Sequence, residues 1–229
     1  MRTGIALAMA GSLFCSRSEA YGQEEPANVG HLRVVNTIAL ETPTMVQVGS
    51  IKMMGGRGMP AGSTSGIMTL YARSYTIAVE NALCTPPSIS KSIEIEAGKT
   101  FAAILYTDIR VADDGTVEHE PKILELKKQV ENKDPTLVLV SMSNRETVDV
   151  TLRGKVVTLR AKQPKEVAVK LDETVGIKSG DVELEALEIL SPINYIVFLF
   201  DEPGGKGLQS VVLQHKKVVY DPPQESFDD

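Results

Sequence analysis

The sequence predicts an all-β protein, made of two small antiparallel β-sandwich domains in tandem after a signal peptide. Short runs of alternating apolar and polar residues recur along the chain, which is typical of strands with one buried face. Near-continuous apolar runs at 101–106 and 195–200 indicate central strands, and a hairpin turn follows each of them. The elements come in the same order in both halves, which indicates two copies of one unit.

The first β-sandwich is expected over residues 31–126 and the second over residues 136–220. In the first half the strand-like runs lie at 31–36, 44–48, 75–80, 101–106 and 117–126. In the second half the matching runs lie, in the same order, at 135–141, 147–152, 182–187, 195–200 and 208–220. Units of this size suit sandwiches of about five to seven strands.

The first twenty residues have the three parts of a secretory signal peptide. A positive start is followed by an apolar run over 5–15 and by small residues at the last and third-last positions, so cleavage is expected after Ala20. Phe14 disfavours a lipid anchor on Cys15, because the position before such a cysteine takes a small residue. No later run reaches the ~18 apolar residues of a membrane span. The mature chain is therefore expected in the periplasm.

Three further segments lie outside the two predicted sandwiches. Residues 21–30 are polar and are expected to form a leader. Residues 127–135 are charged, end in Pro and are the natural linker, and a short helix over 122–133 is the alternative. Residues 221–229 are acidic, contain Pro and are expected to be disordered. Limited proteolysis at the linker is expected to give two stable fragments of roughly 11 kDa.

Charge and cysteine content exclude several functional classes. The net charge is −6, so the chain lacks the basic excess that nucleic-acid binding needs. The sequence has only two Cys, which excludes a disulfide scaffold, a multi-Cys zinc site and a cysteine-ligated iron–sulfur cluster. Removal of the signal peptide leaves Cys84 as the only thiol, and we expect it to be buried and inert rather than reactive.

The sequence contains no recognisable catalytic motif, so no catalytic, cofactor-binding or metal-binding residue is predicted. The string nearest to a nucleophile elbow, at 62–66, has Thr64 where Ser must stand. None of His31, His119 and His215 has an acidic residue three positions before it, as one common exported esterase design requires. Zinc-protease and phosphate-loop motifs do not occur, and no dinucleotide fingerprint follows a predicted strand. We therefore expect a protein that is not an enzyme.

Two acidic segments have a functional and a simpler interpretation. Residues 113–120 are rich in oxygen ligands for calcium but lack EF-hand spacing, so an acidic hairpin turn is favoured. Glu183, Glu185 and Glu188, preceded by Asp181, resemble the paired carboxylates of glycosidases. We favour a solvated strand face, with Val182, Leu184 and Ala186 pointing into the core.

The loop at 53–59 is unusual because three methionines and three glycines fall within seven residues, with Met45 and Met68 nearby in sequence. Methionine side chains adapt to varied contact surfaces, which favours a loop that is flexible or contacts a partner. Copper(I) binding through thioether sulfur is the alternative.

Over about residues 31–220 the organisation resembles the accessory subunit of alginate O-acetylation, the AlgF family. The resemblance rests on opening strands that end in Asn36 and Asn144, and on the aromatic-apolar strand, Gly-containing hairpin and return strand that close each half. The first half also resembles uncharacterised bacterial exported β-sandwich domains, through residues 33–36 and 96–100.

The resemblance implies an exported, non-enzymatic adaptor subunit of a polysaccharide O-acetylation complex. In that family the protein acts between the membrane-bound acetyl-donor machinery and the periplasmic transferases, so protein partners and no cofactor are implied. The alternative is a carbohydrate-binding or uncharacterised cell-envelope module. Sugar binding needs exposed aromatic rings. The chain has no Trp, and most of its Tyr and Phe lie in apolar runs, among them Phe101, Tyr106, Phe198 and Phe200.

Overall fold

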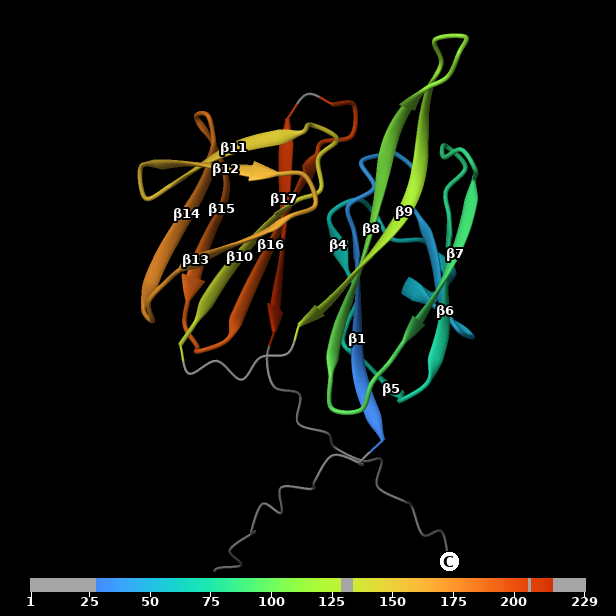
Figure 1. Cartoon of the computed structure of the whole chain (residues 1–229), viewed down its shortest axis with the longest axis horizontal. Helices are drawn as coiled ribbons and strands as arrows, with labels where there is room; N and C mark the ends of the chain where they lie inside the picture. Colours follow the sequence, from blue (N-terminus) through green and yellow to red (C-terminus); the bar gives the residue numbers. More distant parts are fainter. Residues whose placement is uncertain (1–27, 129–133, 206, 216–229) are drawn as a thin grey trace, which may run out of the picture. The chain divides into compact units, whose positions relative to one another are not determined.

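The computed structural model describes residues 28–128, 134–205 and 207–215. These residues form seventeen strands and one 3-10 helix, so the predicted all-β class is confirmed (Figure 1). Two predicted segments lie outside the described residues: the signal peptide at 1–20, with its cleavage site at Ala20, and the tail at 221–229. Most of the predicted leader and most of the predicted linker also lie outside them.

The first half folds into two facing sheets. One sheet has the order β4-β1-β8-β9, with β5 also paired to β1, and the other has the order β3-β2-β6-β7. The elements are β1 (Val29–Asn36), β2 (Met45–Val48), β3 (Ile51–Lys52), η1 (Met53–Gly56), β4 (Ser63–Thr64), β5 (Met68–Tyr71), β6 (Ser74–Glu80), β7 (Ser88–Glu94), β8 (Thr100–Val111) and β9 (Val117–Lys128).

The second half repeats this arrangement, with sheets β13-β10-β16-β17 and β12-β11-β14-β15. Its strands are β10 (Thr136–Ser141), β11 (Thr147–Leu152), β12 (Lys155–Arg160), β13 (Pro164–Ala168), β14 (Glu173–Ser179), β15 (Val182–Ile189), β16 (Asn194–Asp201) and β17 (Leu208–His215). The central pairs β1–β8 and β10–β16 occupy equivalent places in the two sheet orders. The shared topology supports the inferred duplication.

Two details of the predicted strand arrangement were wrong. The central pairs β1–β8 and β10–β16 are parallel, so each sandwich contains one mixed sheet. This is possible because the chain crosses to the facing sheet between the two strands of each pair. In addition, the second-half counterpart of β6 is β14 rather than β15, since β14 lies between β11 and β15 as β6 lies between β2 and β7.

Three apolar cores account for the burial of these sheets. The first core lies within the first sandwich and the second core within the second sandwich. The third, which we call the shared core, combines residues of both halves: Val35, Ala102, Ile104, Val138, Val140, Met142, Ile196, Phe198, Phe200, Val211 and Leu213.

The shared core explains why two strands are apolar on both faces. In β8, Phe101, Ala103 and Leu105 belong to the first core, while Ala102 and Ile104 belong to the shared core. In β16 the residues alternate in the same way between the second core and the shared core. A strand covered on both faces has a near-continuous apolar sequence. The apolar runs therefore mark the surface through which the halves pack.

The described strands also locate the edges of the predicted linker. β1 begins at Val29, within the predicted leader, and β9 continues to Lys128, within the predicted linker. The alternative of a helix over 122–133 is wrong for residues 122–128, which pair with β8 as a strand. Every described strand pair lies within one half. Independent folding of each half stays a prediction.

We predict that cleavage within residues 129–133 leaves the two fragments associated. Each fragment has a mass of roughly 11 kDa, a size at which a small β domain can fold. Separation would expose Phe198 and Phe200, which are fully buried in the shared core. A protease site inserted at 129–133, followed by gel filtration without denaturant, tests this. Elution of two separate fragments would contradict it, and a Phe198→Asp variant is the control that should separate them.

Candidate functional site

A cavity of about 440 Å³ lies beside the end of β8 and takes its lining from both halves. Leu40, Thr107, Ile109 and His119 contribute from the first half. The second half contributes Asn144, Arg145, Asp201, Glu202, Gly204 and Gly205. We call this place the junction site.

The junction site exists because β1 ends before β8 does. The last residue of β1, Asn36, lies opposite Leu105, while β8 continues to Val111 paired only with β9. The buried side chain of Asn36 turns the chain away from the sheet. Its Nδ2 donates to the carbonyl oxygen of Met59 at 2.8 Å, and its Oδ1 accepts from the backbone N–H of Ile38 at 3.1 Å. Residues 107–111 are thereby left as an open strand edge.

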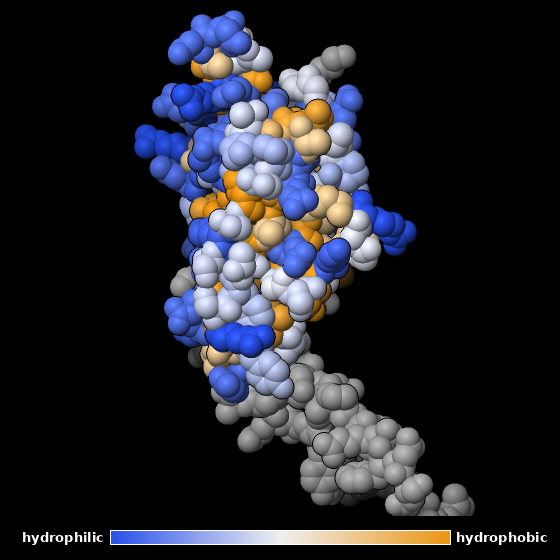
Figure 2. Space-filling view, turned by 90° about the vertical axis from the view of Figure 1, so that its right-hand side faces the viewer, coloured by the Kyte–Doolittle hydropathy of each residue, from blue (hydrophilic) through white to orange (hydrophobic). Residues whose placement is uncertain are grey.

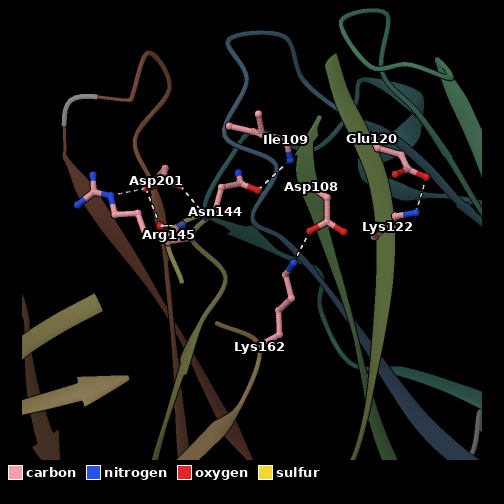
Figure 3. Close-up of polar contacts among 9 residues, drawn as sticks. Asp108, Ile109, Glu120, Lys122, Asn144, Arg145, Lys162 and Asp201 are labelled. Carbon is pink, nitrogen blue, oxygen red and sulfur yellow. Dashed lines mark hydrogen bonds and ion pairs between the residues drawn. The ribbon is translucent and has the colours of Figure 1, made fainter. Parts of the chain in front are cut away.

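Asp201 organises the second-half side of the junction site (Figure 3). Its Oδ1 accepts from Ser143 Oγ at 2.9 Å, and its Oδ2 accepts from the backbone N–H of Asn144 at 3.0 Å. Arg145 Nε lies 3.6 Å from Asp201 Oδ1. These bonds hold Asn144 so that its Oδ1 accepts from the backbone N–H of Ile109 at 3.1 Å. An amide side chain thus bonds one main-chain group of the open edge.

A second set of polar contacts joins the halves beside the shared core. Lys162 pairs with Asp108 and also lies over the ring of Tyr106, with its Nζ 4.8 Å from the ring centroid. Burial raises the pKa of Tyr106, and the charge of Asp108 raises it further. On the neighbouring strand Lys122 pairs with Glu120 (Figure 3). The Lys162–Asp108 pair joins the two halves, whereas the Lys122–Glu120 pair lies within β9.

The polar groups of the junction site form hydrogen bonds that hold its loops in place, and they are not arranged as a nucleophile with a general base. Ser143 Oγ donates directly to Asp201 and accepts from the backbone N–H of Arg145 at 3.2 Å. Among the described residues, no group of three or more His, Cys, Asp or Glu side chains is placed to hold a metal ion. The open edge of β8 is the part of the site with main-chain groups available to a binding partner.

The histidines singled out in the sequence lie apart. His31 is buried in β1, with Nδ1 3.2 Å from Thr69 Oγ1. His119 lines the junction site, and its backbone oxygen accepts from Thr85 N–H at 2.9 Å. The side chain of His215 is outside the described part of the chain.

The serines of the 62–66 string bond to the backbone. Ser65 Oγ accepts from Val34 N–H at 2.8 Å and donates to Gly66 O. Ser63 Oγ donates to Pro60 O at 2.6 Å. Both hydroxyls therefore help to fix the loop that enters and leaves β4.

The acidic segment at 113–120 forms the turn and return strand of the β8–β9 hairpin, as the favoured interpretation predicted. Asp114 Oδ1 accepts from Thr116 N–H at 2.9 Å and also bonds the Thr116 hydroxyl. These bonds lower the pKa of Asp114. Gly115 has a φ of 83°, which the turn requires and a side chain disfavours.

The predicted facing of the 182–188 strand is confirmed for Leu184, which packs against the second core, and is wrong for Val182 and Ala186, which are exposed. Val182 is 62% exposed, while Leu187 and Ile189 are buried. The register of β14 against β15 shifts between Ile177 and Lys178, and this bulge exchanges the two faces of β15 along its length. Glu185 consequently turns inward, where its Oε2 lies 3.4 Å from Ser210 Oγ.

The methionine loop is only partly a surface feature. Met53 and Met59 are buried in the first core, whereas Met54 and Met45 are 44% and 39% exposed. Deletion of residues 53–59 would therefore remove core side chains as well as exposed ones. A point substitution of Met54 is the cleaner test of a contact through this loop.

Most aromatic side chains of the described residues are buried, as their place in apolar runs predicted. Phe101, Phe198 and Phe200 are at most 1% exposed, and Tyr106 packs against the shared core. Tyr71 is the most exposed of the described aromatic side chains, at 66%. Isolated exposure of one ring offers less for sugar stacking than a platform of several rings.

The Cys84 thiol is predicted to react slowly with alkylating reagents. The side chain is buried, as the sequence predicted, and burial raises its pKa to about 11. At pH 8 only about one thiol in a thousand is then the reactive thiolate. We expect iodoacetamide to label the folded protein far more slowly than the same protein in urea. Equal labelling rates in the two conditions would show that the thiol is accessible in the fold.

Sequence analysis did not identify Asp108, Asn144, Lys162 or Asp201 as a group. Asn144 follows one apolar strand and Asp201 ends another, which was the only available signal. The parallel pairing of β10 with β16 brings these two together within the second half, whereas Asp108 reaches Lys162 only through packing between the halves. Within the described part of the chain, no helix is long and apolar enough to cross a membrane. No protein-family model matches the sequence, and a search of curated proteins also found no match.

Proposed function

We propose that the chain is an exported, non-enzymatic adaptor that binds protein partners in a polysaccharide O-acetylation complex. The identity of the proposed complex comes from the resemblance of residues 31–220 to the alginate O-acetylation accessory family. An alginate-like substrate and a periplasmic location are parts of the same proposal. One structural observation supports the adaptor role most directly. The β8–β9 hairpin has an open edge, and Ile109, Val111 and Val117 are 48%, 66% and 54% exposed on it.

The first sandwich offers further apolar surface for protein contact. Met45 of β2 and Ile51 of β3 are exposed on the sheet that also contains β6 and β7. Figure 2 shows apolar side chains gathered in the middle of one face of the molecule, between charged ones. Mixed apolar and charged surfaces are typical of interfaces that form and dissociate.

Affinity capture from an envelope extract of the producing organism tests the proposal. The mature chain is the bait, and mass spectrometry is expected to identify O-acyltransferase components among the captured proteins. Met54→Ser serves as a second bait, because it changes the exposed methionine and leaves the buried ones in place. Capture of no protein, together with binding of the purified polysaccharide, would favour the carbohydrate-binding alternative.

The absence of catalysis is tested separately. Purified protein supplied with an activated acetyl ester is expected to release no more acetate than buffer alone, since an adaptor needs no nucleophile of its own. Turnover that a single Ser or His substitution abolishes would contradict the non-enzymatic assignment.

A further inference from the structure

The open edge of β8 differs from the edge strands β9, β12 and β17 in the side chain that bonds its main chain. Unpaired edges invite pairing with another chain, and proteins block them with charged side chains. Arg33 donates to Gln214 O on the edge strand β17 at 3.0 Å, and Lys91 donates to Ile123 O on β9 at 3.2 Å. Lys165 likewise donates to Thr158 O on β12 at 3.2 Å. Within residues 107–111 Lys162 pairs with the Asp108 side chain, while the main-chain N–H of Ile109 bonds the neutral amide of Asn144.

The Asn144 side chain occupies the place that a strand carbonyl would take. Its Oδ1 accepts from Ile109 N–H, which shows that this N–H points away from β9. Main-chain groups alternate in direction along a strand, so those of Thr107 and Val111 point to the same open side. The cavity of about 440 Å³ touches Thr107 and Ile109 on this side. An amide on an exposed loop can swing away when a peptide carbonyl replaces it.

The side chains on the two faces of the open edge determine which side chains an added strand must carry. Ile109 continues the face of Phe101, Ala103 and Leu105, and it lines the cavity together with Leu40. A residue placed opposite Ile109 projects to the same face and should be apolar. Asp108 and Arg110 project to the other face, and a basic residue opposite Asp108 would share its carboxylate with Lys162. Like charges directly opposite one another destabilise a strand pair, so an acidic residue is disfavoured opposite Asp108 and a basic one opposite Arg110.

We propose that residues 107–111 of β8 bind one extended segment of a partner protein as an added antiparallel strand, and that this segment carries an acidic–apolar–basic triplet. In an antiparallel pair the residue before the apolar one lies opposite Arg110, and the residue after it lies opposite Asp108. Strand addition of this kind gains affinity from main-chain hydrogen bonds and specificity from alternate side chains. This inference rests on the proposed adaptor function and names the chemistry of the partner.

Binding of labelled peptides to the mature protein tests the inference by fluorescence anisotropy. The probe is Thr-Thr-Glu-Val-Lys-Thr-Thr, and the control is the same peptide with Glu and Lys exchanged. We expect the control to bind about fivefold more weakly or worse, because both of its charged pairs become repulsive. Equal binding of the two peptides, or tighter binding of the control, would overturn the assigned pairing.

Two variants locate the binding on β8. Ile109→Pro removes an N–H that does not pair with β9, so it should abolish binding while the fold is kept. Val182→Ala, an exposed position of β15 outside the junction site, should bind as the original chain does. Arg110→Glu changes a surface charge and should remove the preference for the probe over the control peptide. Unchanged binding and preference in both variants would overturn the site.

Two further outcomes separate this inference from its alternatives. Asp108-Ile109-Arg110 itself has the acidic–apolar–basic order. A dimer seen by sedimentation, abolished by Arg110→Glu and unaffected by the peptide, would replace the partner segment with a second copy of the chain. If Ile109→Pro and the original chain capture acyltransferase components equally, the adaptor function stands and residues 107–111 are not its binding site. If the peptide binds but no such components are captured, residues 107–111 stand as a binding site and the adaptor function is overturned.

Discussion

Replacement of Phe198 by Ala is expected to lower the free energy of unfolding by about 3–5 kcal/mol. The side chain is 0% exposed on β16 and lies in the shared core, between the sheets of the two halves. Its removal leaves a cavity that neighbours in both sheets can fill only in part. Urea denaturation followed by circular dichroism measures the loss.

Val182→Ala is the matched control, because it shortens an apolar side chain that is 62% exposed. We expect it to change the free energy of unfolding by about 0.5 kcal/mol or less. A loss below about 1 kcal/mol for Phe198→Ala would mean that the shared core adds little to stability. Two separate transitions in the original chain would show that the halves unfold independently.

Substitution of Gly30 by Ala is expected to destabilise the first sandwich by about 1–3 kcal/mol. A Cβ atom at this position of β1 would lie 2.3 Å from the backbone oxygen of Glu96 and 2.8 Å from Ile95 Cγ2. The nearest obstacle is main chain, so β1 and the segment that leads into β8 must move apart. The same denaturation assay measures the effect.

Gly66→Ala controls for the general effect of replacing glycine. A Cβ atom at Gly66 meets no heavy atom within 4 Å, and its φ is outside the left-handed region. We expect a change within a few tenths of a kcal/mol, with a small gain because the unfolded chain becomes less flexible. Equal losses for Gly30→Ala and Gly66→Ala would show that the close approach at β1 relaxes without cost.

The Phe198 prediction also concerns the frame that holds the junction site. Phe198 fixes how the sheet of β16 packs on that of β8, and this packing brings Asn144 to Ile109. A loosened shared core should therefore alter peptide binding as well as stability. Phe198→Ala is for this reason unsuitable as a binding control, whereas Val182→Ala changes an exposed side chain outside the junction site.

The sequence by itself determined the strand content and the doubled order of the fold. Alternating runs at 44–48 and 147–152 became β2 and β11, and the apolar runs became β8 and β16. The sequence also located both hairpins through their turn residues. Burial of one face imposes a period of two on the side chains, so strands of this kind are visible in a single sequence.

The tertiary structure alone decided which strands pair and what covers each face. The bulge of β15 opposite Ile177 and Lys178 brings Leu187 and Ile189 into the core and leaves Ala186 exposed, although the local pattern there still alternates. The parallel pairing of β1 with β8 and the open edge at 107–111 both follow from where distant strands end. An apolar run shows that a strand face is buried but does not identify the element that packs against it. For β8 and β16 that cover is the other half of the chain, which only long-range packing brings into contact.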